Sequence, residues 1–212
     1  MDEDMDWTTG RLLVATPLTG GAFERSVVLV LHHDEDGAHG LVLNQPLDAS
    51  VDVVLPQWQP FVTEPGVLFR GGPVGLDTAM GLVSVPGHDP GDAPLGTQLL
   101  FGGIGLVDLD APAPLVVPEL GAFRIFVGYS GWGPGQLDEE IRQGAWYVLP
   151  REPRDPFQED TTDLWREVLL RQRSSVSFAT TRRWPFARRL SKRKMPSGTK
   201  LWKFPRPPPS KK

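Results

Sequence analysis

The sequence predicts a fold of many short strands joined by tight turns, with two short helices, rather than a helical bundle. Glycine (23 residues) and proline (22 residues) together make up about a fifth of the 212 residues, against roughly 12% in an average protein. Both residues are unfavourable inside helices. Short apolar runs also alternate with polar, glycine-containing connections, which is the pattern of strands and turns.

The elements follow in order along the chain. Apolar runs predict strands at residues 12–15, 27–31, 41–43, 67–69, 81–85, 99–101, 124–129 and 145–149. The second and third runs flank a polar connection at 34–37 that ends in glycine, so we expect a hairpin there. A first helix should follow Gly133 and Pro134 and end at Gly144. A second helix should begin near Thr161 or Thr162, where apolar residues take helical spacing.

Charge divides the chain into an acidic body and a basic tail. Residues 1–170 hold all 26 acidic residues against eight arginines and no lysine, which gives a formal charge of −18. Residues 171–212 hold eight arginines, six lysines and no acid, which gives +14. We therefore expect an acidic extension at 1–9, a folded domain at 10–170, and a basic, proline-containing tail at 171–212 that is disordered alone.

Residue types and spacing argue against cofactor and metal sites. The absence of cysteine excludes disulfides, iron–sulfur clusters and cysteine zinc sites. His32 and His33 are neighbours in an expected strand and point to opposite faces, so they do not suit a shared metal. The glycine clusters at 71–75 and 102–105 lack the spacing of a phosphate loop, and we expect turns or close backbone approaches there. We expect neither a metal nor a cofactor.

Two patterns could support catalysis. Ser130 lies in GYSGW (128–132), near the pattern of a nucleophile elbow, but Trp132 stands in place of the last glycine. Asp138, Glu139 and Glu140 could pair for acid–base chemistry, yet acids in the first turn of a helix also suit the helix dipole. We assign no catalytic residue and prefer a binding protein to an enzyme.

Five segments resemble the YqgE/AlgH family of bacterial proteins: GRLLVATP (10–17), FERSVV (23–28), GAHGLVLNQP (37–46), GGPV (71–74) and GWGPGQL (131–137). The resemblance covers residues 10–170, with Gln45 where a basic residue is common in the family. It implies an α+β fold with a bent, barrel-like mixed β-sheet flanked by short helices. It also implies a binding or regulatory module of uncharacterised biochemical function.

One family member is labelled a transcriptional regulator of alginate synthesis. This sequence shows no helix-turn-helix pair, however, and a body of −18 would repel phosphates. The expected binding cleft instead collects the turn residues of the resemblance, which are Asn44, Arg70, Gly71, Gly72, Tyr129, Trp132 and Gln136. The expected partner is a protein or a small anionic ligand, because Arg70 is one of few cations in the body and Trp132 offers a flat apolar contact.

Each of these candidates also has a structural interpretation. Asn44 could cap a turn, Arg70 could form an ion pair, and Trp132 could belong to the core. We expect Trp132 and Trp146 to be buried, because they bracket the first helix.

The basic tail suggests a second function, in nucleic-acid binding. Cations interleaved with aromatic residues suit phosphate neutralisation and base stacking. The candidate residues are Arg182, Arg183, Arg188, Arg189, Lys192, Arg193 and Lys194. The alternative is a change of reading frame near the end of the gene, because family members end soon after the second helix, and the tail would then have no selected function.

The ends and hydropathy of the chain bear on its location. The first residues are acidic, and no apolar run reaches the roughly 18 residues that a spanning helix needs. We therefore expect no secretory signal, no contact with a membrane and a cytoplasmic location.

Overall fold

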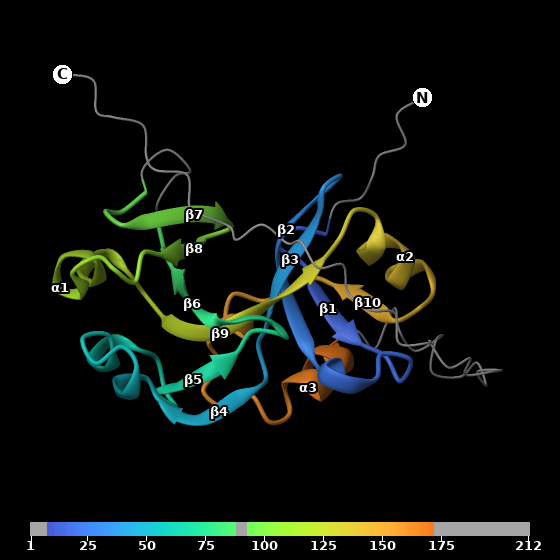
Figure 1. Cartoon of the computed structure of the whole chain (residues 1–212), viewed down its shortest axis with the longest axis horizontal. Coiled ribbons are helices and arrows are strands. Elements are labelled where there is room, and N and C mark those ends of the chain that lie inside the picture. The colour runs from blue at the N-terminus through green and yellow to red at the C-terminus, as the bar shows by residue number, and fades with distance from the viewer. Residues whose placement is uncertain (1–7, 88–92, 172–212) are drawn as a thin grey trace, which may run out of the picture. The chain divides into compact units, whose positions relative to one another are not determined.

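The computed structural model describes residues 8–87 and 93–171 (Figure 1). The central strand of its sheet is β9 (Phe123–Trp132). Within these residues ten strands form one sheet, in the order β10-β1-β2-β3-β9-β6-β8-β7, with β5 beside β9 and β4 beside β5. The strands are β1 (Leu12–Ala15), β2 (Val27–Asp34), β3 (Gly37–Val42), β4 (Pro46–Ser50), β5 (Val67–Arg70), β6 (Val74–Ser84), β7 (Thr97–Phe101), β8 (Ile104–Val107) and β10 (Trp146–Leu149).

Short helices complete this part of the chain. They are α1 (Ala113–Val116), α2 (Gln136–Arg142) and α3 (Leu164–Arg171), with 3₁₀ turns η1 (Gly21–Phe23), η2 (Val51–Val53), η3 (Gln59–Phe61), η4 (Val117–Glu119) and η5 (Asp155–Phe157). No helix among the described residues is long and apolar enough to cross a membrane. All described residues belong to one compact unit.

Strand β9 joins two groups of strands because its two halves have different neighbours. Its last residues, from Ser130 to Trp132, pair with β3. Its first half pairs with β6 in antiparallel fashion and with β5 in parallel. The sheet is therefore mixed, and in Figure 1 β9 runs between the β4–β8 group and the β1–β3 group.

The two edges of the sheet approach each other. Arg151, just after edge strand β10, donates from Nη2 to the Gly102 carbonyl at 2.8 Å, in the turn between β7 and β8. Its guanidinium also lies 5.4 Å from the centre of the Phe101 ring, on edge strand β7. The sheet is a curled half-barrel with a few short helices, which confirms the expected α+β class and the bent, barrel-like sheet.

Three apolar clusters fill the fold. The first lies within the curl, where Leu29, Leu41 and Phe126 meet Leu164 of α3. The second contains Trp132, Leu137 and Trp146 and lies beneath α2. The third contains Trp58, Val116 and Phe123. Trp132 and Trp146 are 6% and 3% exposed, which confirms their expected burial.

Several predicted element bounds need correction. β1 and the hairpin of β2 and β3 lie where we expected them, but β6 begins seven residues before the expected Gly81. β4 and β8 were not predicted. α3 begins at Leu164, two to three residues after the expected start near Thr161 or Thr162. β4 and the first half of β6 are rich in polar and small residues, so their pairing depends on tertiary neighbours rather than on a local apolar pattern.

Candidate functional site

The GWGPGQL segment builds a hydrogen-bonded clamp around the carboxylate of Glu140. The Trp132 and Trp146 indoles donate to Glu140 Oε2 at 2.9 and 2.8 Å, and Gln136 donates to Oε1 at 3.0 Å. Gln136 in turn accepts from the Gly133 backbone at 3.1 Å. One carboxylate thus joins the end of β9, α2 and the start of β10. Trp132 and Gln136 are engaged in holding these elements together.

Asn44 has both ends of its carboxamide engaged. Its Oδ1 accepts from the Val27 backbone, and its Nδ2 donates to the Arg25 carbonyl, both at 2.9 Å. These contacts tie the end of β3 to the turn before β2. Asn44 therefore caps a turn.

Gly71 and Gly72 allow the β5–β6 connection to pass directly against β9. A Cβ at Gly71 would lie 2.3 Å from the Gly128 carbonyl oxygen, and one at Gly72 would lie 2.3 Å from the Tyr129 carbonyl oxygen. Ser130 is fully buried and donates to the Gly71 carbonyl at 3.1 Å. The Ser130 hydroxyl, which was the candidate nucleophile, thus holds β9 against the β5–β6 connection.

Arg70 and Tyr129 are the candidates whose side chains are less constrained. Arg70 is exposed, and its side chain forms no hydrogen bond or ion pair with any residue that the structure describes. The Tyr129 ring is half-buried and lies 5.6 Å from the His39 ring. None of the seven expected cleft residues lines the cavity beside Arg151 or the cavity beside Trp165.

The three histidines of the β2–β3 hairpin have separate environments. His32 is exposed and lies 2.6 Å from an Asp34 oxygen, whereas His33 is buried between Thr8 (2.9 Å) and Asp138 (3.4 Å). Burial lowers the pKa of His39 from its ordinary value. In residues 8–87 and 93–171 no three His, Asp or Glu side chains are grouped as metal ligands.

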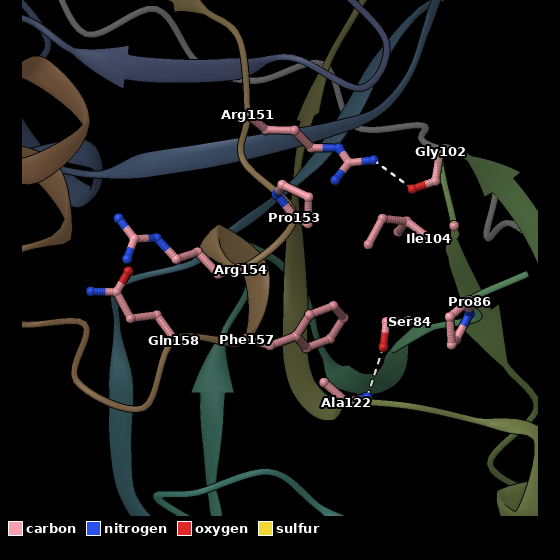
Figure 2. Close-up of a pocket in the computed structure, with 11 residues that line it drawn as sticks. Ser84, Pro86, Gly102, Ile104, Ala122, Arg151, Pro153, Arg154, Phe157 and Gln158 are labelled. Carbon is pink, nitrogen blue, oxygen red and sulfur yellow. Dashed lines mark hydrogen bonds between the residues drawn. The ribbon is translucent and has the colours of Figure 1, made fainter. Parts of the chain in front are cut away.

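A cavity of about 520 Å³ lies where the two edges of the sheet approach each other (Figure 2). Its lining comes from four separate parts of the chain: Ser84 and Pro86, the turn residues Gly102 to Ile104, Ala122, and the segment that holds Arg151, Pro153, Arg154, Phe157 and Gln158. A volume of this size is typical of small-molecule sites. We call it the Arg151 cavity.

The Arg151 cavity combines apolar walls with one arginine that has no ion pair with any described residue. Its lining includes two of the eight arginines of the acidic body and no acidic side chain. Arg154 is paired with Glu152 at 3.1 Å, and in Figure 2 its guanidinium points away from Ile104 and Ser84. Arg151 donates to the Gly102 carbonyl and has no ion pair within 4.0 Å among the described residues. Burial lowers the pKa of Arg151, and the charge of Asp155 partly offsets this effect.

Ser84 supplies a second polar group to the Arg151 cavity. Its Oγ accepts from the Ala122 backbone N–H at 2.7 Å, which leaves the hydroxyl proton available for a ligand. In Figure 2 Arg151 lies at one end of the cavity and Ser84 and Phe157 lie at the other, with Ile104 between them, and the Ser84 oxygen points toward Ala122. An apolar group with one anionic end would therefore find a surface and two donors here.

A third arginine, Arg124, supports the wall of the cavity from inside the protein. Its guanidinium donates to the carbonyls of Pro156 (3.2 Å), Gln158 (2.8 Å) and Glu64 (3.2 Å), and it lies 4.1 Å from the centre of the Phe69 ring. Burial lowers its pKa to about 10, so it keeps its charge at neutral pH. Arg124 thus fixes the backbone on both sides of Phe157, whose ring lines the cavity.

Sequence reasoning missed the residues of this cavity and the role of Glu140. The scarcity of cations offered one signal, because Arg151 and Arg154 closely follow a predicted strand in a body with only eight arginines. The candidate nucleic-acid residues, from Arg182 to Lys194, lie outside the described residues.

The comparisons with known proteins agree on one family. The AlgH-like family matches residues 12–177. A UPF0301 protein of Streptomyces coelicolor is 54% identical over 175 residues, which cover 82% of this chain and 91% of that protein. A UPF0301 protein of Thermobifida fusca is 46% identical over 183 residues, which cover 82% of this chain and 91% of that protein.

Two solved structures share the fold. A crystal structure of a Corynebacterium diphtheriae protein has a TM-score of 0.75 and 32% identity, and the match covers 85% of this chain and 95% of that one. The solution structure of the AlgH protein of Pseudomonas aeruginosa has a TM-score of 0.61 and 25% identity, with 86% and 97% covered.

Proposed function

This chain belongs to the AlgH-like family, and we propose that it is a non-enzymatic binding module whose Arg151 cavity takes a small organic anion. The observation that carries the proposal is the reversal of charge. In a body of −18, the cavity lining contains no acidic residue, and the Arg151 guanidinium has no carboxylate within 4.0 Å among the described residues. A ligand anion would supply that partner.

The lining indicates the kind of anion. Phe157, Ile104 and Pro86 offer apolar surface, so a purely inorganic anion would leave most of the cavity unused. A ligand with an aromatic or aliphatic body and one phosphate or carboxylate group would bury its body there. Its anionic group would contact Arg151, and Ser84 would donate to a second polar atom.

A binding role also agrees with the state of the residues that suggested catalysis. Ser130 is buried and bonded to backbone. Asp138 contacts His33, Glu139 pairs with Arg142, and Glu140 accepts from two indoles. These side chains hold structural contacts, which supports binding over acid–base or nucleophilic chemistry.

Melting temperatures measured with and without ligand test this proposal. Phenyl phosphate and benzoate should raise the melting temperature, because a ligand present at about 100 times its Kd stabilises the native state by about 2.7 kcal/mol. Benzyl alcohol, which has no anionic group, should not raise it. Arg151→Gln should abolish the shift, and Arg151→Lys should keep part of it. Arg142→Gln, which removes an exposed arginine from α2, is the matched control and should leave the shift intact. Equal shifts in Arg151→Gln and the parent chain would refute the site.

The basic tail supports a second candidate function, in nucleic-acid binding. The supporting observation is the charge of +14 in residues 171–212 beside a body of −18. Because the body repels phosphate, any such binding would belong to the tail and would not depend on nucleic-acid sequence.

A further inference from the structure

Arg25 has an unusual backbone conformation. Its φ is 52°, and among the described residues it is the one non-glycine residue with positive φ. An L-residue with a long side chain is unfavourable in this region, and such strain persists only where the surroundings enforce it. Glycine would fit this position without strain.

The end of β3 enforces the conformation. Asn44 accepts from the Val27 backbone and donates to the carbonyl of Arg25 itself. The next residue, Gln45, donates to the Ala22 carbonyl at 3.0 Å. The carboxamides of Asn44 and Gln45 thus hold the turn that carries Arg25, and they fix the position of the Arg25 backbone.

The turn also borders a second cavity, of about 380 Å³, which is separate from the Arg151 cavity. It is lined by Ala15, Thr16, Pro17, Thr19, Gly20, Glu24, Arg25 and Trp165. The Trp165 indole donates to the Ala15 carbonyl at 2.8 Å, which fixes the ring and leaves its half-buried surface to the cavity. The Thr16 and Thr19 hydroxyls donate to the carbonyls of Gly144 and Ala145. The walls are therefore held in place by internal hydrogen bonds.

Two opposite charges border this cavity without neutralising each other. Glu24 and Arg25 both line it, and neither side chain forms an ion pair or hydrogen bond with any residue that the structure describes. The lining therefore has no net charge but offers one carboxylate and one guanidinium. A ligand that satisfies both must carry an ammonium and an anionic group.

We propose that this cavity binds a small zwitterion of the amino-acid type. The ligand's carboxylate contacts Arg25, its ammonium contacts Glu24, and its apolar side chain packs on the Trp165 ring. Asn44 is a positioning residue for Arg25. The proposal is independent of the Arg151 cavity, because the two cavities share no lining residue.

The first test uses the Trp165 indole N–H signal in ¹H–¹⁵N spectra of the full chain, assigned with Trp165→Phe. L-phenylalanine should shift it saturably. L-phenylalaninamide, which lacks the carboxylate, and N-acetyl-L-phenylalanine, which lacks the ammonium, should each bind roughly tenfold more weakly or not at all. No shift with L-phenylalanine, or equal shifts with all three compounds, would overturn the proposal.

The second test separates binding from folding. Arg25→Gly should weaken L-phenylalanine binding by about tenfold or more and should also raise the melting temperature, because glycine relieves the positive φ. Arg11→Gln, which removes an exposed arginine outside the cavity, should change neither quantity. An Arg25→Gly chain that binds as tightly as the parent, or that melts at a lower temperature, would contradict the proposal.

Discussion

At the scale of single residues, the structure rests on a few side chains that satisfy several partners at once. Glu140 accepts from Trp132, Trp146 and Gln136, and Arg124 donates to three backbone carbonyls. Removing the acceptor of a buried donor lowers the free energy of unfolding by more than the hydrogen bond contributed, because the donor is left without a partner and without water. Substitution of such residues should therefore lower the stability of the protein strongly.

Glu140→Ala should lower the free energy of unfolding by roughly 2–4 kcal/mol, because two buried indole N–H groups lose their acceptor. Glu140→Gln keeps an acceptor oxygen and should lower it less. Chemical denaturation measures both. Glu139→Ala, at the neighbouring exposed position, should leave the midpoint nearly unchanged, and an equally small effect of Glu140→Ala would show that the clamp is not stabilising.

His39 should make stability sensitive to acid. Its pKa is lowered from the ordinary value of 6.5, first by burial and then by the charge of His32. Below that ordinary value the unfolded chain takes up the proton more readily than the folded one, so the free energy of unfolding falls as pH falls.

Denaturation curves measured from roughly pH 7 to pH 5, the range in which histidines titrate, check this expectation. His39→Gln should reduce the acid-side loss of stability. His32→Gln should keep most of that loss, because burial is the first cause of the shift. An unchanged pH dependence in His39→Gln would contradict the assignment.

At the scale of elements, local signals and tertiary pairing explain what could be predicted. β1 and α2 have local signals, an apolar run in one case and Pro134 and Gly144 in the other, and both lie where we expected them. β8 contains Gly105 and directly follows a glycine turn, so its local sequence indicates a loop. It becomes a strand because β6 and β7 pair with it on either side.

Strand β10 should depend on Trp146. The ring is 3% exposed and packs in a T-shaped contact on Trp132, with centroids 6.0 Å apart. Trp146→Ala should lower the free energy of unfolding by about 3–5 kcal/mol, as for other core aromatic residues. A loss under about 1 kcal/mol would show that the ring does not belong to the core.

At the scale of the whole molecule, the cavities could not be predicted from local sequence. The Arg151 cavity draws its lining from four stretches between Ser84 and Gln158, which meet because the sheet curls. The expected cleft instead followed glycine-rich turns, and several of those residues hold β9 against the β5–β6 connection or form the Glu140 clamp. Charge asymmetry, by contrast, depends on composition alone and is visible in the sequence.

That asymmetry makes a testable prediction for nucleic-acid binding. Each tail cation that contacts a single-stranded phosphate should contribute about 0.7 to the slope of log affinity on log salt, so eight contacts give a slope near −6. Titrations of one oligonucleotide at two salt concentrations measure this slope for the full chain. A chain that ends at Gln172 should not bind, and sequence-specific, salt-tolerant binding by that shortened chain would refute the electrostatic explanation.

The most direct test of the central claim, that the Arg151 cavity binds an organic anion, is a ¹H–¹⁵N NMR titration of the full chain with phenyl phosphate. We predict that the largest saturable shifts fall on the backbone amides of Gly102 and Gly103 and on the Arg151 side-chain N–H. Shifts centred on Arg70 and Tyr129, or no saturable shift, would contradict the claim.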